Sequence, residues 1–167
     1  MKKMTEANVK DALAGESQAH VRYLAFSAKA ASENLPNVAR MFQATAYSEQ
    51  VHAINHLKTL AGVGTTAANL GAAVSGETFE IDEMYPAYVK VAELQGEKSA
   101  LMYANYALAA EKVHARIYGQ ALAAVEKGRD IDAAPIHVCS VCGFTVEGEA
   151  PDKCPVCGSP KEKFVKF

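Results

Sequence analysis

The feature that most constrains this chain is a five-residue pattern, Glu-x-Val-His-Ala, which occurs twice in helix-forming sequence. The first copy begins at Glu49 and contains His52, and the second begins at Glu111 and contains His114. Residues three apart lie on the same face of a helix, so each Glu and His can bind the same metal ion. One such pair is common on helix surfaces, but two matched copies predict two metal ions held by a duplicated helical hairpin.

The sequence up to about residue 127 has the periodicity of amphipathic helices. Apolar residues recur three and four apart among Ala, Leu, Glu, Lys and Met, with few helix breakers. Proline at position 36 and glycine at position 96 indicate short breaks, whereas residues 62–76, with four glycines, indicate a long crossover. The pattern predicts an all-α four-helix bundle with one long crossover. Its expected helices span residues 5–33, 36–61, 78–94 and 97–127.

Carboxylates in the other two helices complete the predicted metal centre. Bundles that hold two iron or two manganese ions use a Glu from each of two helices and Glu-x-x-His from each of the others. Glu16 is the candidate in the first helix, and Glu80 and Glu83 share a face of the third. Carboxylate oxygens bridge two ions and offset their charge, while imidazoles favour a first-row transition metal over magnesium or calcium.

The remaining histidines and nearby tyrosines are interpreted more simply. We expect His20 and His56 to lie outside the ligand set, partly exposed or beside it, and His137 to lie at the surface. Tyrosines near the ligands are interpreted as core residues or as hydrogen-bond donors to carboxylates. These are Tyr23, Tyr88 and Tyr118.

The last 29 residues contain all four cysteines, arranged as two Cys-x-x-Cys-Gly motifs. Such pairs predict a tetrahedral metal site, which a segment too small for its own hydrophobic core needs in order to fold. Geometry alone allows either zinc, which only stabilises the module, or one iron, which also carries an electron. The predicted domains are a bundle at 1–128, a linker at 129–136 and a metal-bound module at 137–167. The predicted ligands are Cys139, Cys142, Cys154 and Cys157.

Charge and composition narrow the classes of partner. The formal net charge is −2 and there is no basic stripe, so we expect neither nucleic acid nor an anionic membrane surface as a partner. The sequence has no apolar run of about 18 residues and no apolar stretch behind the N-terminal lysines. Paired metal-binding cysteines need a reducing compartment, so a cytoplasmic location is expected.

Taken together, these motifs resemble those of the rubrerythrin family over nearly the whole chain. The resemblance implies a ferritin-like bundle with a carboxylate-bridged di-iron centre, a rubredoxin-like Fe(Cys)₄ domain, and the reduction of hydrogen peroxide to water. The motifs that carry it are Gly15-Glu16-Ser17-Gln18-Ala19-His20, both Glu-x-Val-His-Ala copies, Glu80-Ile81-Asp82-Glu83-Met84-Tyr85-Pro86, and the cysteine tail.

The resemblance also implies individual roles and partners. One iron is expected to shift between His52 and Glu83 with redox state. Electrons are expected from a rubredoxin or an NAD(P)H-dependent reductase through the cysteine-bound iron, in a homodimer or higher homo-oligomer. The implied di-iron ligands are Glu16, Glu49, His52, Glu80, Glu83, Glu111 and His114.

Two alternative functions remain open at this point. The same di-iron centre serves iron oxidation and storage in ferritin-type shells, although that function leaves the cysteine tail unexplained. The chain is alternatively a metal-binding redox module whose cysteine tail holds structural zinc. Metal content and colour distinguish the last alternative, since a ferric tetrathiolate is red and zinc is colourless.

Overall fold

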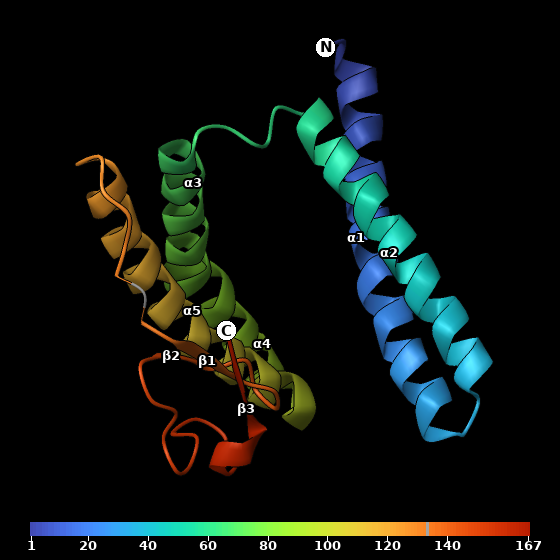
Figure 1. The fold of residues 1–167 in the computed structure, drawn as a ribbon, viewed down its shortest axis with the longest axis vertical. Coiled ribbons are helices and arrows are strands. Elements are labelled where there is room, and N and C mark those ends of the chain that lie inside the picture. Colours follow the sequence, from blue (N-terminus) through green and yellow to red (C-terminus); the bar gives the residue numbers. More distant parts are fainter. Residues whose placement is uncertain (133) are drawn as a thin grey trace. The chain divides into compact units, whose positions relative to one another are not determined.

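The computed structural model describes residues 1–132 and 134–167, and it is built mainly from helices (Figure 1). These residues form two units, 1–64 and 65–167, each with its own internal packing. Within the residues described, no helix is both long and apolar enough to cross a membrane.

The first unit is a hairpin of helices α1 (Lys3–Ser32) and α2 (Pro36–Thr59). Both helices lie within two residues of their predicted bounds. Asn34, in the connection, adopts a left-handed conformation with φ 58°, and Pro36 begins α2, where its missing N–H removes no helical hydrogen bond. The predicted turn before Pro36 is therefore confirmed.

Small residues let the two helices of the hairpin approach closely. Ala30, Ala39 and Ala46 are its buried residues. Across the interface, His20 Nδ1 lies 2.8 Å from the backbone oxygen of Ala46, a contact that holds this imidazole between the helices. An aromatic cluster packs farther along the hairpin, with ring centroids 5.5–6.3 Å apart. Its members are Tyr23, Phe26 and Phe42.

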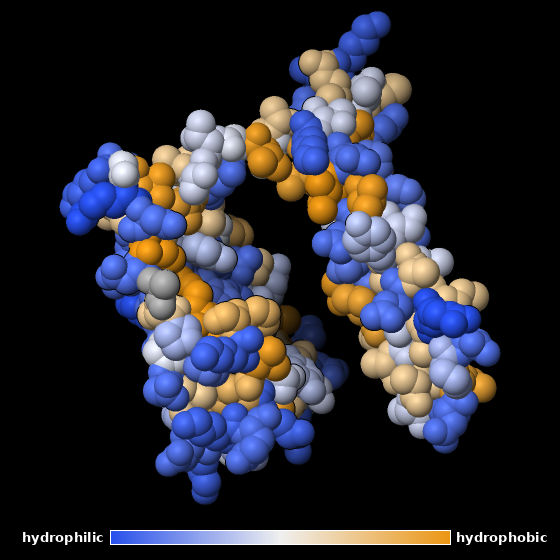
Figure 2. All heavy atoms as spheres, viewed as in Figure 1, coloured by the Kyte–Doolittle hydropathy of each residue, from blue (hydrophilic) through white to orange (hydrophobic). Residues whose placement is uncertain are grey.

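The hairpin keeps much apolar surface exposed, because two helices alone bury only the stripe along which they meet. Figure 2 shows hydrophobic side chains scattered over its surface among polar ones. Helices of a bundle bury such residues against further helices. The exposed apolar residues of the hairpin include Val21, Leu24, Met41, Val51 and Ile54.

The helical part of the second unit begins earlier than the sequence predicted. Helix α3 (Thr66–Phe79) continues through a π-helical turn, η1 (Glu80–Met84), into α4 (Tyr85–Gln95), and α5 (Lys98–Val125) follows. The predicted start at residue 78 and the long crossover at 62–76 are wrong. The Thr65 side chain accepts a hydrogen bond from the Ala68 N–H and caps α3, and the glycines at positions 71 and 76 lie within the helix. The connection after α2 is therefore residues 60–65.

The helix ends in this unit follow ordinary backbone rules. Gly96 ends α4 with φ 72°, a conformation that glycine adopts at little cost, so the predicted break at residues 95–96 is confirmed. The five residues of η1 insert one extra residue into an otherwise continuous helix, and such π turns are frequent at functional sites. The insertion shifts the faces presented before and after it.

The C-terminal module is a three-stranded antiparallel sheet in the order β2-β1-β3. Strand β1 (Ile136–Cys139) pairs with β2 (Thr145–Glu147) and with β3 (Phe164–Lys166), and a short 3₁₀ turn, η2 (Lys161–Lys163), precedes β3. The buried residues of this sheet region are few and small, so packing alone provides little stability. They are Cys139, Thr145, Ala150 and Cys154.

Candidate metal centres

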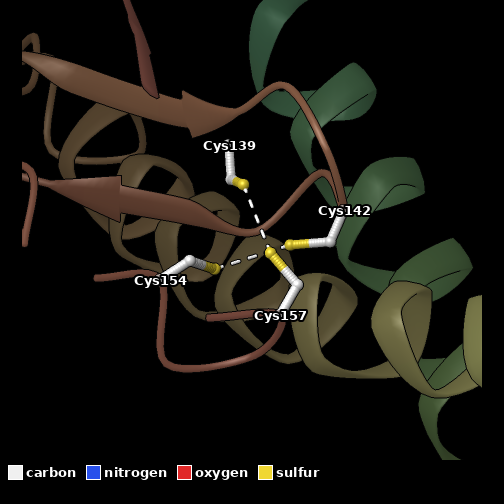
Figure 3. Close-up of side chains that lie close together, drawn as sticks. All are labelled: Cys139, Cys142, Cys154 and Cys157. Atoms are coloured by element: carbon white, nitrogen blue, oxygen red, sulfur yellow. Dashed lines mark hydrogen bonds between the residues drawn. The ribbon is translucent and has the colours of Figure 1, made fainter. Parts of the chain in front are cut away.

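The four cysteines of the C-terminal module surround a common point (Figure 3). The sulfur of Cys139 lies 3.7 Å from that of Cys157, and the sulfur of Cys142 lies 3.5 Å from that of Cys154. A tetrahedral ion with metal–sulfur bonds of about 2.3 Å places its sulfurs about 3.8 Å apart. All four thiols are free of disulfides, so their spacing and chemistry fit one tetrahedrally bound ion.

The backbone of both Cys-x-x-Cys-Gly turns prepares this geometry. The N–H of Gly143 donates to the Cys139 carbonyl at 2.8 Å, and the N–H of Gly158 donates to the Cys154 carbonyl at 2.9 Å. Both glycines have positive φ, 79° and 74°, which other residues adopt only with strain. The turns therefore bring each pair of sulfurs to one side without help from a large core.

The sulfurs also differ in their electrostatic surroundings. Burial raises the pKa of the Cys142 thiol. Although burial acts to raise the pKa of Cys157, hydrogen bonds with the side chain and backbone of Ser159 and with neighbouring cysteines lower it to about 6. Cys157 thus supplies thiolate, the metal-binding form, near neutral pH.

The first carboxylate–imidazole cluster lies within the helical hairpin. Glu16 comes from α1, and Glu49 and His52 come from one face of α2, as predicted. His52 Nδ1 is 3.0 Å from Glu49 Oε2 and 3.8 Å from Glu16 Oε1. The three ligand atoms lie within 4.8 Å of one another, a span that one metal ion can bridge.

The second cluster lies in the other unit and has the same composition. Glu111 and His114 come from α5, with His114 Nδ1 2.6 Å from Glu111 Oε2. The third member is Glu77, from the last turn of α3. Each cluster thus joins a Glu-x-x-His pair on one helix to a single Glu on the helix that packs beside it, so the repeat seen in sequence is a repeat of structure.

The structure brings together five of the seven residues predicted as ligands and adds one candidate, Glu77, that the sequence analysis missed. In the second cluster, the carboxylate beside Glu111 and His114 is Glu77, where Glu80 and Glu83 were expected. It was missed because the third helix was expected to begin at residue 78, although Glu77 precedes Glu80 by the same three-residue step that joins Glu80 to Glu83. That spacing was the available signal.

The other two predicted carboxylates differ in their surroundings. Glu80 is partly buried, and its pKa is raised by burial and by the charge of Glu111, while His114 acts in the opposite direction. It therefore lies within electrostatic reach of the second cluster. Glu83 is exposed and belongs to neither cluster among the described residues.

Negative charge accumulates in the second cluster. The pKa of Glu77 is raised to about 7 by burial, by its hydrogen bond with Glu111, and by the charges of Glu111 and Glu80. The pKa of Tyr85, at the start of α4, is raised by burial and by the same three carboxylates. Partly buried carboxylates that repel one another are stabilised by a bound cation, so the donor set fits a divalent transition metal.

Comparison with known proteins shows to which family the chain belongs. Residues 7–122 match the family model described as Rubrerythrin, and residues 137–165 match that of the rubrerythrin rubredoxin-like domain. The chain belongs to the rubrerythrin family. Members of this family are di-iron proteins involved in oxidative stress, with a carboxylate di-iron site and a Cys₄ rubredoxin-like site. The predicted helical bundle with a metal-binding C-terminal module is therefore confirmed, apart from the long crossover, and so are the two kinds of metal centre.

Individual rubrerythrin relatives align along almost the whole chain. Rubrerythrin-2 of Clostridium acetobutylicum is 40% identical, covering 98% of this chain and 97% of that protein. Nigerythrin of Nitratidesulfovibrio vulgaris is 36% identical, covering 98% and 86%. The structure of nigerythrin in its fully reduced, all-ferrous state has a TM-score of 0.57 and 32% identity, with coverage of 98% and 86%. Membership in this family indicates an oxidoreductase.

Proposed function

We propose that this chain is a di-iron peroxidase that reduces hydrogen peroxide to water with electrons relayed through its cysteine-bound iron. The observation that carries the proposal is the pair of matched Glu/Glu/His clusters, one in each unit, together with a Cys₄ module packed on the helix that bears His114. Two clusters provide for two metals, and the module provides a separate one-electron site.

Each unit holds three of the proposed metal ligands. Glu80 is proposed as an additional carboxylate next to the second cluster, and exposed Glu83 is left out of the set. The carboxylates neutralise the charge of the ions, and each imidazole contributes a nitrogen that favours iron over magnesium or calcium. The six residues of the clusters are Glu16, Glu49, His52, Glu77, Glu111 and His114.

The reaction requires two electrons and two protons for each peroxide, because H₂O₂ + 2e⁻ + 2H⁺ yields two waters. Two irons held by the clusters would supply both electrons, and an iron held by the four cysteines would return them one at a time. Cys139, Cys142, Cys154 and Cys157 hold that third ion as thiolates. Tyr85 lies close enough to the carboxylates of the second cluster for their charges to raise its pKa.

The proposed partners follow from the need to restore electrons after each turnover. A rubredoxin or an NAD(P)H-dependent reductase is the proposed donor to the cysteine-bound iron, in a homodimer or higher homo-oligomer. The nigerythrin structures include fully and partially reduced states, which supports a redox cycle in that relative. The proposed domains are the di-iron bundle at 1–128, a linker at 129–136 and the iron–cysteine domain at 137–167.

A single-turnover experiment tests the proposal. Protein loaded with iron is reduced without oxygen, and one equivalent of hydrogen peroxide is added while the optical spectrum records oxidation of ferrous iron. We expect two ferrous ions to be oxidised per peroxide in the native protein. Glu111→Gln is expected to abolish this oxidation, whereas Glu93→Gln, in an exposed ion pair on α4, is expected to leave it intact.

Three outcomes contradict the proposed peroxidase or its electron relay. Ferrous protein that remains reduced after stoichiometric peroxide rejects the proposal. Oxidation that is faster with dioxygen than with peroxide, accompanied by a large hollow assembly in light scattering, favours iron oxidation and storage. Zinc in place of the cysteine-bound iron rejects the proposed electron relay.

A further inference from the structure

Thr145 lies at the start of β2 and has only 4% of its surface exposed. Among the described residues it is the one buried residue with a polar side chain. Its hydroxyl oxygen lies 2.8 Å from Nε2 of His114 on α5. It is also 3.2 Å from the carbonyl oxygen of Gly143, to which the hydroxyl donates. A residue of the cysteine module therefore contacts the imidazole of the second carboxylate cluster directly.

The two ring nitrogens of His114 face different groups. Nδ1 is 2.6 Å from Glu111 Oε2, on the side where the cluster converges, and Nε2 faces Thr145. A neutral imidazole that gives the Nδ1 lone pair to a metal must carry its one proton on Nε2. That N–H needs an acceptor, because burying it without one is costly.

Thr145 meets this need through its own hydrogen-bond pattern. A hydroxyl has one hydrogen and two lone pairs. Since the hydrogen goes to the Gly143 carbonyl, which can only accept, a lone pair of the hydroxyl oxygen is left for the Nε2–H of His114. The chain of bonds runs from His114 through Thr145 to Gly143, the residue that follows the cysteine ligand Cys142.

We infer that Thr145 is a positioning residue that holds the proton of His114 on Nε2 and thereby makes Nδ1 the metal-binding atom. The inference rests on the proposed metal pair and assigns to the cysteine module a second role, orienting a ligand of the carboxylate site. Partners of this kind around metal-bound histidines change metal affinity or activity by about 10–100-fold when they are removed.

The first cluster provides an internal comparison. His52 uses Nδ1 in the same way, at 3.0 Å from Glu49. Its side chain is 51% exposed, and none of the described residues forms a hydrogen bond with its Nε2. Removing the hydroxyl of Thr145 should therefore weaken metal binding at one cluster and leave the other unchanged.

A second contact between α5 and the cysteine module makes it possible to distinguish two effects of Thr145. One is the orientation of the imidazole, and the other is the docking of the module on the helix. Arg116 on α5 forms an ion pair with Glu147 on β2 at 2.7 Å, two residues along each element from the His114–Thr145 contact. Glu147→Gln removes this docking contact without touching His114. It is the matched control for Thr145→Val, which replaces the hydroxyl with a methyl group of similar size. Thr145→Ser is the variant that retains the hydroxyl.

The test is a titration with Mn²⁺, which prefers carboxylate and imidazole to thiolate ligands. Full-length protein keeps iron in its cysteine site, recorded by its visible band, while a chelator empties the other sites. Free Mn²⁺ is then counted by electron paramagnetic resonance. We expect two bound ions in the native protein, about 10-fold or greater weakening of one of them in Thr145→Val, and native affinities in Thr145→Ser and Glu147→Gln.

Three results overturn the inference. Native affinity in Thr145→Val rejects a role for the hydroxyl while leaving the metal pair intact. Equal weakening in Glu147→Gln shows that docking alone matters. A native protein that binds no Mn²⁺ rejects both the inference and the proposed metal centre.

A measurement on the native protein alone covers the case in which Thr145→Val does not fold. In protein loaded with diamagnetic zinc at the carboxylate sites, ¹⁵N spectra of the histidine rings report which nitrogen carries hydrogen. For His114 we expect a proton on Nε2 and metal on Nδ1. The opposite assignment overturns the inference without any variant.

Discussion

The two Glu/Glu/His clusters have the same residues at the same helical spacing, yet they lie in different surroundings. In the hairpin, the side chain of His52 is 51% exposed, whereas that of His114 in the second unit is 26% exposed. The difference comes from β2, which packs on α5 and places Thr145 against the imidazole. A duplicated motif thus supplies equivalent ligands, and the cysteine module makes them inequivalent by covering one copy.

The largest expected effect comes from removing the metal of the cysteine module. Cys142→Ser leaves three thiols, and a module with so few buried residues is expected to unfold without its ion. Limited proteolysis should then cleave residues 137–167 rapidly. Mn²⁺ affinity should fall at the His114 cluster and stay constant at the His52 cluster.

The control for that prediction is Val141→Ala, which changes an exposed residue in the same Cys-x-x-Cys turn. It should leave both the visible band and the proteolysis pattern unchanged. If Cys142→Ser weakens both clusters equally, the module does not distinguish them and the comparison fails.

The next largest effect concerns which carboxylate completes the second cluster. Glu77→Gln removes a proposed ligand and is expected to lower the rate of peroxide-dependent iron oxidation by at least about 100-fold, more than loss of an outer partner. Glu83→Gln alters an exposed side chain and should change this rate by less than about twofold. Stopped-flow measurement of both variants checks the assignment. A larger effect in Glu83→Gln than in Glu77→Gln identifies Glu83, which was predicted from sequence, as the ligand.

A smaller effect is expected in the pH dependence of stability of the metal-free protein. Because the pKa of Glu77 is raised to about 7 in the folded chain, from 4.5, the folded state binds more protons between these values. The contribution of Glu77 to the free energy of unfolding is complete below pH 4.5 and is lost as the pH rises through 7. At about 1.4 kcal/mol per pKa unit the loss is at most between about 3 and 4 kcal/mol, and less with solvent screening.

Denaturant unfolding of native and Glu77→Gln protein at several pH values measures this effect. The variant should show a flatter profile between pH 4.5 and 7, since its amide does not titrate. Parallel profiles for the two proteins contradict the expected contribution of Glu77.

The smallest effect is expected from the ion pair that helps dock the module. Arg116 and Glu147 are partly exposed, with side chains 50% and 35% accessible, and such pairs contribute up to about 1 kcal/mol. Thermal unfolding of Glu147→Gln should show a small loss, similar to that of Glu93→Gln, which breaks a pair on α4. A loss of several kcal/mol identifies this pair, rather than Thr145, as the main contact.

Local patterns in the sequence predicted most of the helices and the metal-binding motifs. The hairpin turn, the break at Gly96 and the Cys-x-x-Cys-Gly turns depend on backbone preferences of the residues themselves, so they were predicted correctly. The start of α3 was not, because Gly71 and Gly76 suggest a loop when considered alone. Packing against α5 and the Thr65 cap maintain the helix through them. Glu77 was missed for this reason.

The sequence by itself determined which residues are available as ligands, because i, i+3 spacing and Cys-x-x-Cys turns are properties of a few consecutive residues. It also determined the order of helices and module along the chain. Only the tertiary structure decided that Glu77 joins Glu111, that Glu83 stays in solvent, and that Thr145 lies against His114. The two contacts join residues far apart in sequence, 31 positions in the case of His114 and Thr145. They depend on how whole elements pack, which no local pattern encodes.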